Sequence, residues 1–176
     1  MRVVAGRLRG RRLVMPAGAV TRPTADRVRE AIFSILGDVS GLRVLDLFAG
    51  SGALGIEALS RGACELDLVD QDRCAATAIE RNLSGLGLEA RSHRREVVAW
   101  LDAQPAGRTF ELVFCDPPYD SAARLAAPLA ERLPQILDPE ARIVTESHKR
   151  TPLELPLPLL RERTYGDTRI AVHRAG

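Results

Sequence analysis

Short apolar runs alternate with amphipathic stretches through most of this chain. The apolar runs predict strands at 43–48, 65–69, 88–93, 110–115 and 141–146. Apolar residues at helical spacing predict helices in the stretches between them, at 53–61, 72–83, 95–102 and 121–133. Repeated strand, helix and strand units are typical of an α/β fold with a mostly parallel sheet and helices on both faces.

The end of the chain departs from this alternation. Residues 160–165 and 169–173 predict two strands, and the Gly166-Asp167 pair between them is typical of a hairpin turn. We therefore expect the sheet to finish with an antiparallel strand.

The beginning of the chain predicts a small β-hairpin followed by a helix. Residues 2–6 and 11–14 are short β-like runs around a turn. Thr24 is suited to cap a helix that begins at Ala25 and stops before Gly37. This helix should pack on the core that follows.

Length and composition limit the class of protein. A chain of 176 residues has the size of one domain, and we expect a single domain over 1–176 with a hairpin extension at 1–21 and a core at 22–176. No apolar run approaches the roughly 20 residues that cross a bilayer, and the N-terminus lacks the pattern of a cleaved signal peptide. We therefore expect a soluble cytoplasmic protein with no membrane partner. We also expect it to be a monomer.

Cysteine and histidine residues give no sign of a metal site. Cys64, Cys74 and Cys115 are an odd number and lack close CxxC pairing, so we expect reduced, structural thiols and no bound metal. The histidines have no metal-like spacing either: they are His93, His148 and His173.

Positive charge is concentrated at the N-terminus. Residues 1–29 hold eight arginines and one acid, about +7, which leaves about −5 for the rest of a chain whose formal net charge is +2. Arginine side chains pair with phosphate oxygens and displace condensed counterions, so the clustering favours contact with nucleic acid. The arginines that we assign to this contact are Arg2, Arg7, Arg9, Arg11 and Arg12.

A glycine-rich turn follows the first strand of the core. Gly50, Gly52 and Gly55 come directly after 43–48 and open a helix, which lets a ligand approach the backbone at the carboxyl edge of the sheet. The same spacing satisfies the dinucleotide fingerprint, and Asp70 at the end of the next strand could hold a ribose diol, as in an NAD site. The glycines alone leave the cofactor open.

Asp46 favours one cofactor over the other. It stands at the end of the strand, inside the turn, where a pyrophosphate would bind. A carboxylate there repels phosphate and attracts an ammonium or sulfonium group. S-adenosylmethionine carries both cations and no phosphate, so we predict it as the cofactor.

The tetrapeptide Asp116-Pro117-Pro118-Tyr119 follows the strand at 110–115, which in a doubly wound sheet lies beside the first strand and its turn. An amine conjugated with a base ring is a poor nucleophile. Hydrogen bonds to the Asp116 carboxylate and the Pro117 carbonyl would oppose that conjugation and align the nitrogen with the methyl group. The prolines fix the backbone, and Tyr119 offers a face for stacking. The motif predicts methylation of an exocyclic amine on a flipped or unstacked base.

Other functions remain compatible with these residues. A DNA adenine-N6 methyltransferase would use the same motif, although a chain of 176 residues leaves little room for a target-recognition region. A protein glutamine-N5 methyltransferase faces the same chemical problem, but typically carries Asn-Pro-Pro-Tyr and gives the arginines no evident role. The third alternative is a non-catalytic RNA-binding assembly factor of the ribosome, against which the intact Asp46, Gly50, Gly52 and Asp116 argue.

Three segments and the Asp-Pro-Pro-Tyr motif together resemble the RsmD family of bacterial 16S rRNA guanine-N2 methyltransferases, nearly end to end. The segments are Val3-Val-Ala-Gly-Arg-Leu-Arg-Gly-Arg-Arg-Leu13, Arg22-Pro-Thr-Ala-Asp-Arg-Val-Arg-Glu-Ala-Ile-Phe33 and Leu45-Asp-Leu-Phe-Ala-Gly-Ser-Gly-Ala-Leu-Gly-Ile-Glu-Ala-Leu-Ser-Arg-Gly-Ala63. The resemblance implies a class I S-adenosylmethionine-dependent methyltransferase fold, which is Rossmann-like. It also implies methylation of one guanine of 16S rRNA, in assembling or assembled small subunits.

The same resemblance implies further cofactor contacts. It places Thr24 and Arg27 near the cofactor's amino-acid end, where Arg27 could pair with the carboxylate. Glu96 would replace the short Asp or Asn that such folds usually offer to the adenine amine. The full set of expected cofactor residues is Thr24, Arg27, Asp46, Phe48, Ala49, Gly50, Ser51, Gly52, Asp70, Gln71 and Glu96.

Overall fold

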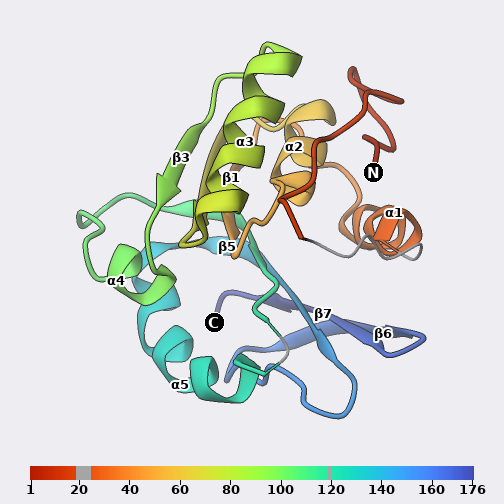
Figure 1. Ribbon diagram of the computed structural model, residues 1–176. Coiled ribbons are helices and arrows are strands. Elements are labelled where there is room, and N and C mark those ends of the chain that lie inside the picture. Colours follow the sequence, from red (N-terminus) through yellow and green to blue (C-terminus); the bar gives the residue numbers. More distant parts are fainter. Residues whose placement is uncertain (19–24, 119) are drawn as a thin grey trace.

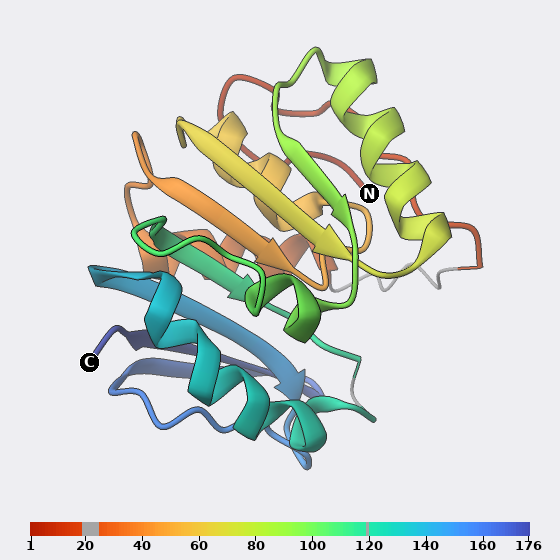
Figure 2. The same ribbon diagram turned by 90° about the vertical axis from the view of Figure 1, so that its left-hand side faces the viewer.

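The computed structural model describes residues 1–18, 25–118 and 120–176 (Figure 1). Thr24 and Tyr119, to which the sequence assigns a cofactor contact and a stacking face, lie outside the described residues. A seven-stranded sheet with the order β3-β2-β1-β4-β5-β7-β6 runs through the molecule. Figures 1 and 2 show helices on both of its faces, which confirms the predicted α/β class.

Five parallel strands form the larger part of the sheet. They are β1 (Arg43–Leu47), β2 (Glu65–Asp70), β3 (Arg91–Arg94), β4 (Phe110–Cys115) and β5 (Leu137–His148). In the register, Asp46 of β1 lies between Leu68 of β2 and Phe114 of β4. The chain therefore moves outward from β1 in one direction and from β4 in the other, which makes the β1/β4 boundary the topological switch point.

The sheet ends with two antiparallel pairings. β7 (Thr168–Arg174) lies between β5 and β6 (Leu159–Tyr165) and is antiparallel to both, as the sequence predicts. β5 is longer than the predicted strand at 141–146, because its residues pair with β7 as far as His148 and Leu137 pairs with Phe110 beyond a register shift.

Two layers of helices cover the sheet. α1 (Ala25–Leu36), α2 (Ala53–Ser60) and α3 (Arg73–Leu86) pack on one face; α4 (Val97–Leu101), α5 (Ala122–Arg132) and the 3₁₀ helix η1 (Leu133–Ile136) pack on the other. Alternate residues of a strand point to opposite faces. Accordingly, Val44 contacts the first layer, while Leu45 and Leu47 contact the second, and none of the three is exposed.

Capping residues set several element boundaries that the apolar pattern missed. α3 begins after Asp72, whose carboxylate accepts from the Ala75 N–H at 2.8 Å, and ends at Gly87, which has a φ of 62°. α4 begins at Val97 because the preceding Glu96 caps it. The predicted starts at 72 and 95 are therefore early.

The N-terminal arm (residues 1–18) is less regular than the predicted hairpin. One antiparallel bridge joins Arg2 and Arg12, and three backbone hydrogen bonds connect the same two limbs, from the N–H groups of Val3, Gly10 and Leu13. The N–H groups of Val4 and Ala5 bond instead to Glu57 of α2. The arm is therefore bound to the core, and its backbone uses the core in place of a longer hairpin ladder.

Some features of other protein classes are not found in the described part of the chain. No helix there is both long and apolar enough to cross a membrane. No group of three or more His, Cys, Asp or Glu side chains there is arranged to hold a metal ion. The cysteines are free; Cys115 is buried, whereas Cys64 and Cys74 are exposed, so the expected structural role does not follow from burial for these two.

Candidate active site

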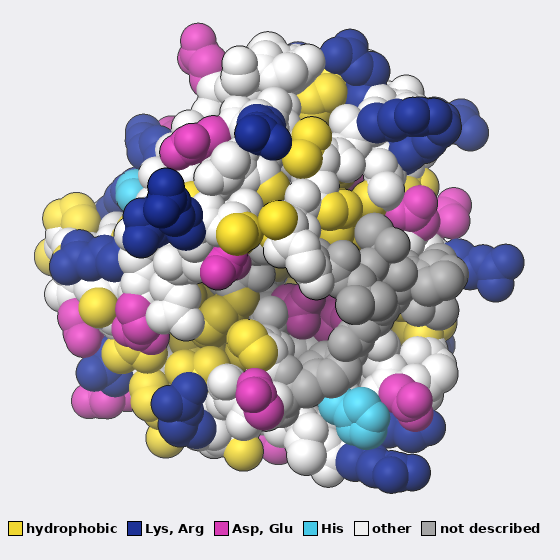
Figure 3. Space-filling view, in the orientation of Figure 1, with side chains coloured by type: hydrophobic (Ala, Val, Ile, Leu, Met, Phe, Trp, Pro, Cys, Tyr) yellow, Lys and Arg dark blue, Asp and Glu magenta, His cyan; other side chains and the backbone are white. Residues whose placement is uncertain are grey.

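A cavity of about 1310 Å³ lies at the carboxyl ends of the parallel strands. The glycine loop after β1 and the Asp116-Pro117-Pro118 turn after β4 both line it, which confirms that the two motifs face each other. Figure 3 shows a hollow in this face with acidic side chains inside it. The volume is sufficient for a nucleoside cofactor together with a base.

The glycine loop has a backbone that few residues tolerate. Phe48, Gly50 and Gly52 have φ angles of 61°, 57° and 76°, in the left-handed region, and Phe48 is the non-glycine residue among them. A Cβ atom on Gly52 would lie 2.9 Å from a methyl carbon of Leu68. The loop therefore packs tightly on the sheet, and Phe48, Ala49, Gly50 and Ser51 line the cavity.

Two carboxylates at the ends of β1 and β2 hold this loop. The Gly55 N–H donates to Oδ2 of Asp46 at 2.9 Å, and the Gly50 N–H donates to Oδ2 of Asp70 at 2.8 Å. The other oxygen of Asp70 accepts from the Asp72 N–H at 2.8 Å. Both carboxylates also line the cavity, so each can serve the loop and a ligand at once.

Burial changes the charge that Asp46 carries. Its side chain is almost inaccessible, and this burial raises the pKa of the carboxyl to about 8, against the opposing effect of the Gly55 N–H. At neutral pH the carboxyl therefore holds a proton in the free protein. A cation beside it would favour the ionised form, so the charge argument from the sequence applies once a cationic ligand is present.

This pKa predicts a pH-dependent effect of Asp46→Asn on stability. In the unfolded chain the pKa of this carboxyl is about 3.9. Its raised pKa in the folded protein therefore stabilises the fold fully below about pH 4, and this stabilisation is lost as the pH rises through about 8. Asparagine keeps a carbonyl acceptor for Gly55 and does not ionise. In urea unfolding, we expect the variant to match the native protein at pH 4 and to exceed it by about 5 kcal/mol at pH 8.5, since the pKa rises from about 3.9 to about 8 and each unit is worth about 1.4 kcal/mol. An identical difference at both pH values would contradict the raised pKa.

The far end of the cavity is formed by the residues after β2 and β3. Gln71 follows Asp70, and Glu96 stands before α4; both line the cavity. Oε2 of Glu96 accepts from the Ala99 N–H at 2.8 Å as the cap of α4. To make the predicted contact with an adenine amine, the Glu96 carboxylate would therefore have to accept from the amine and from the Ala99 N–H at once.

The cavity residues fit S-adenosylmethionine. Acidic groups at Asp46 and Asp70 suit a cation and a ribose diol, and the loop between them offers backbone in close approach. When bound there, this cofactor would supply an activated methyl group, and its position would be set by the loop and by the carboxylates that hold it.

The Asp116 turn lines the same cavity as this loop. Asp116 is partly exposed, Pro117 is buried and Pro118 is exposed. The Ser121 N–H donates to the Pro118 carbonyl at 2.8 Å, which closes a turn ahead of α5. The two prolines and this bond fix the direction in which Asp116 enters the cavity.

The structure brings further residues to the cavity that the sequence did not indicate. Glu146 of β5 and Thr168 of β7 line the wall next to the Asp116 turn, and Met1 and Met15 of the arm line another part. No motif marks them, because each depends on how strands or the arm are placed in space. The N-terminal arm is therefore part of the site as well as a charged surface.

Of the expected cofactor residues that the structure describes, two are not among those that line the cavity. Gly52 acts through the backbone, as the N-cap of α2. Arg27 is exposed and lines a separate depression of about 240 Å³ with Arg2 and Arg9 of the arm. Its neighbour Arg29 lines the cavity instead, because residues two apart on a helix point in nearly opposite directions. The position of Arg27 thus does not support its expected pairing with the cofactor carboxylate.

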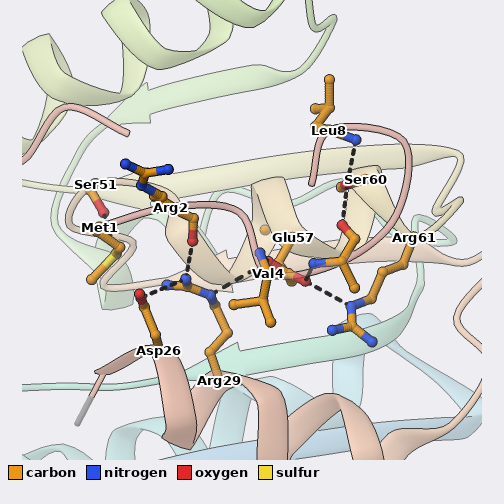
Figure 4. Close-up of polar contacts among 12 residues, drawn as sticks. Met1, Arg2, Val4, Leu8, Asp26, Arg29, Ser51, Glu57, Ser60 and Arg61 are labelled. Carbon is orange, nitrogen blue, oxygen red and sulfur yellow. Dashed lines mark hydrogen bonds and ion pairs between the residues drawn. The ribbon is translucent and has the colours of Figure 1, made fainter. Parts of the chain in front are cut away.

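A buried carboxylate attaches the arm to the core. Glu57 has no exposed surface, and its carboxylate accepts from the N–H groups of Val4 at 2.7 Å and Ala5 at 2.9 Å. It also lies 2.9 Å from Nε of Arg61 and 3.5 Å from Nε of Arg29. Figure 4 shows these groups converging on Glu57 from the arm, α1 and α2.

Additional hydrogen bonds extend this attachment along the arm. The Ser60 hydroxyl accepts from the Leu8 N–H at 3.0 Å and donates to the Ala5 carbonyl at 2.6 Å. Asn82 of α3 bonds to both the N–H and the carbonyl of Val14, and its amide also donates to the Ser51 carbonyl at 2.9 Å. Asn82 therefore connects the arm directly to the cofactor loop.

The arginine side chains of the arm are not part of these contacts, although Arg11 donates to the Gly85 carbonyl of α3 at 3.1 Å. Their backbone is fixed on the core, while the side chains are exposed at Arg2, Arg7, Arg9, Arg11 and Arg12. Figure 3 shows basic side chains gathered on the side where Figure 1 draws the arm. The predicted basic surface is present, and it adjoins the cavity through Met1 and Met15.

The fold and the site define a class I S-adenosylmethionine-dependent methyltransferase. A family model described as "Conserved hypothetical protein 95" matches residues 1–174. The chain therefore belongs to this family, that of the RsmD methyltransferases.

Relatives match over nearly the whole chain. "Putative rRNA methyltransferase YlbH" of Bacillus subtilis is 41% identical over an aligned length of 183 residues. The alignment covers 99% of this chain and 98% of the relative. "Ribosomal RNA small subunit methyltransferase D" of Haemophilus influenzae is 37% identical, over 94% of this chain and 89% of the relative. A solved structure from Escherichia coli, "Putative methyltransferase yhhF", is 34% identical and superposes with a TM-score of 0.84 over 99% of this chain and 97% of its own.

A more distant structure shares the fold. It is the Thermus thermophilus 16S rRNA N2 G1207 methyltransferase in complex with AdoMet and guanosine, which is 21% identical and has a TM-score of 0.73. It covers 92% of this chain and 45% of its own chain. At this identity the likeness concerns the fold alone.

Proposed function

We propose that this protein transfers a methyl group from S-adenosylmethionine to the exocyclic N2 amine of a guanine in 16S ribosomal RNA. The observation that carries the chemistry is the placement of the Asp116 turn and the glycine loop across one cavity. The target amine would donate hydrogen bonds to the Asp116 carboxylate and the Pro117 carbonyl. Its lone pair would then point toward the methyl group held by the loop.

The RNA substrate is supported by the arm and by the family. Exposed arginines lie on the arm, which adjoins the cavity at Met1 and Met15, and there an RNA backbone can be held while one base enters. The Haemophilus influenzae relative is a methyltransferase of the small-subunit ribosomal RNA. We propose that this protein acts likewise, as a monomer in the cytoplasm, on assembling or assembled small subunits.

A substrate comparison tests this function. Purified protein and tritiated S-adenosylmethionine would be incubated with naked rRNA, hypomethylated small subunits, duplex DNA and a mixture of cell proteins. We expect incorporation into small subunits to exceed that into DNA and protein by at least about 100-fold, the usual scale of specific over non-specific recognition. Preferred labelling of DNA or protein would support the adenine or glutamine alternative.

The arm predicts a change in salt dependence. We expect the triple variant Arg7→Gln, Arg9→Gln and Arg12→Gln to weaken RNA binding at least about tenfold and to lower the slope of log K against log salt by about 2, since each phosphate contact contributes about 0.7–0.9. Filter binding to 16S rRNA at several salt concentrations measures both quantities.

A matched control removes three exposed arginines elsewhere. Arg161, Arg163 and Arg174 lie on β6 and β7, away from the arm, and their side chains are exposed. The same substitutions there should leave the slope unchanged. Equal slopes for the two triple variants would mean that the arm makes no specific phosphate contacts.

A further inference from the structure

Glu146 lies next to Asp116 on the wall of the cavity. β4 and β5 are parallel, and their register pairs Cys115 with Thr145. Asp116 and Glu146 are the residues that follow this pair on the two chains, and both line the cavity. A base whose amine is held at Asp116 would therefore lie near Glu146 as well.

Glu146 belongs to the face of β5 that looks toward α1. Val144, two residues earlier, packs in the core cluster on that face, and alternate residues of a strand share a face. Val28 and Ile32 of α1 line the same cavity. Glu146 is partly exposed, so its carboxylate is accessible to a molecule in the cavity.

Thr168 continues this wall on the next strand. It lies opposite His148 in the antiparallel register of β5 and β7, two residues beyond Glu146 and on the same face. The wall therefore presents three polar groups in the order of the strands. The Asp116 carboxylate follows β4, the Glu146 carboxylate lies on β5 and the Thr168 hydroxyl lies on β7.

This order of acceptors and donor is complementary to the Watson–Crick edge of guanine. That edge presents, in sequence, the N2 amine as a donor, N1–H as a donor and O6 as an acceptor. An ionised carboxylate only accepts, whereas a threonine hydroxyl can donate. Adenine has a lone pair at N1 beside its amine, and this lone pair would face the Glu146 carboxylate without a proton between them.

We propose that Glu146 selects guanine by accepting the hydrogen bond of N1–H while Asp116 holds the N2 amine. This inference rests on the proposed function and goes beyond it, because the Asp116 turn suits any conjugated amine and does not choose the base. Glu146 is the specificity-determining residue for the base, and Thr168 supports it by donating to O6.

The test replaces the target guanine by 2,6-diaminopurine, which keeps the N2 amine but has a lone pair at N1. Small subunits would be reconstituted from ligated rRNA that carries either base at the mapped target, and kcat/KM would be measured for each. We expect the native protein to prefer guanine by at least about 100-fold, since a site built for N–H donation rejects an analogue that lacks it. For Glu146→Gln we expect the ratio to fall below about tenfold, because the amide can donate to N1 of diaminopurine and can accept from N1–H of guanine.

The control is Glu140→Gln, on an exposed residue of the same strand that is not among those lining the cavity. It should keep the native ratio. The affinity for S-adenosylhomocysteine, measured by calorimetry, should change less than about threefold in both variants. A purely structural effect of Glu146→Gln would lower kcat/KM for both bases and leave their ratio unchanged, which would overturn the inference, as would loss of cofactor binding.

Failure of the proposed function gives a different result. If the native protein forms no N2-methylguanosine in unmodified small subunits, the function itself is wrong. If it forms this product and the ratio in Glu146→Gln equals the native ratio, the function stands and the role of Glu146 is wrong.

Discussion

Asp116→Ala should reduce the single-turnover rate of methyl transfer by about 100- to 1000-fold, the scale seen when one preorganised hydrogen-bonding group is removed from an active site. The reason is that the carboxylate supplies the acceptor that keeps the amine lone pair available. The loop after β1 and its bracing carboxylates are separate from the Asp116 turn. We therefore expect the cofactor dissociation constant to change less than about threefold.

Two variants accompany this measurement. Asp116→Asn keeps one neutral acceptor and should fall between the native protein and the alanine variant. Asp102→Ala removes an exposed carboxylate that pairs with Arg132 on the surface, and should retain the native rate. Turnover of Asp116→Ala comparable to that of Asp102→Ala would remove Asp116 from the mechanism.

Glu57→Ala should lower the free energy of unfolding by about 3–5 kcal/mol, because the buried Arg29 then loses its buried charge partner and keeps only the exposed Asp26. Arg29 is almost fully buried beside Glu57, and the Val4 and Ala5 N–H groups lose their acceptor. Urea unfolding measures this loss. The arm should also become more sensitive to trypsin, since its backbone is attached to the core through this residue.

The control for Glu57 is an exposed glutamate on the neighbouring helix. Glu80→Ala on α3 should change stability by less than about 0.5 kcal/mol, as is usual for surface positions. Glu57→Gln keeps the shape and one acceptor, and should lose less than Glu57→Ala. A loss below 1 kcal/mol for Glu57→Ala, with an unchanged rate of arm cleavage, would show that Glu57 does not hold the arm.

The sequence predicted those parts of the site that depend on local pattern and on general rules of α/β topology. Asp46 and Asp116 follow buried apolar runs, and the right-handed connections of a doubly wound sheet place such strands beside each other. The glycines between Gly50 and Gly55 required a turn wherever the chain folded. The fold class and the meeting of the two motifs followed from these residues.

Parts of the site that depend on distant contacts could not be predicted in this way. Glu57 lies on a helix, and a charged helix residue is ordinarily expected to be exposed. The arm covers it instead, through a residue 53 positions earlier in the chain. Glu146 reaches the cavity because β5 pairs with β4, and Thr168 does so because β7 lies between β5 and β6. Arg27 is exposed whereas Arg29 is buried, and Arg29 donates to the Arg2 carbonyl of the arm, a distant contact that no local pattern marks.

The central claim is that guanine N2 receives the methyl group, and the identity of the methylated nucleoside tests it most directly. Hypomethylated small subunits would be incubated with the protein and ¹³C-methyl S-adenosylmethionine, and the rRNA would be digested and analysed by mass spectrometry. We predict a single labelled nucleoside, N2-methylguanosine, at one position of 16S rRNA. Label in N6-methyladenosine, or label in ribosomal protein with none in RNA, would contradict this account.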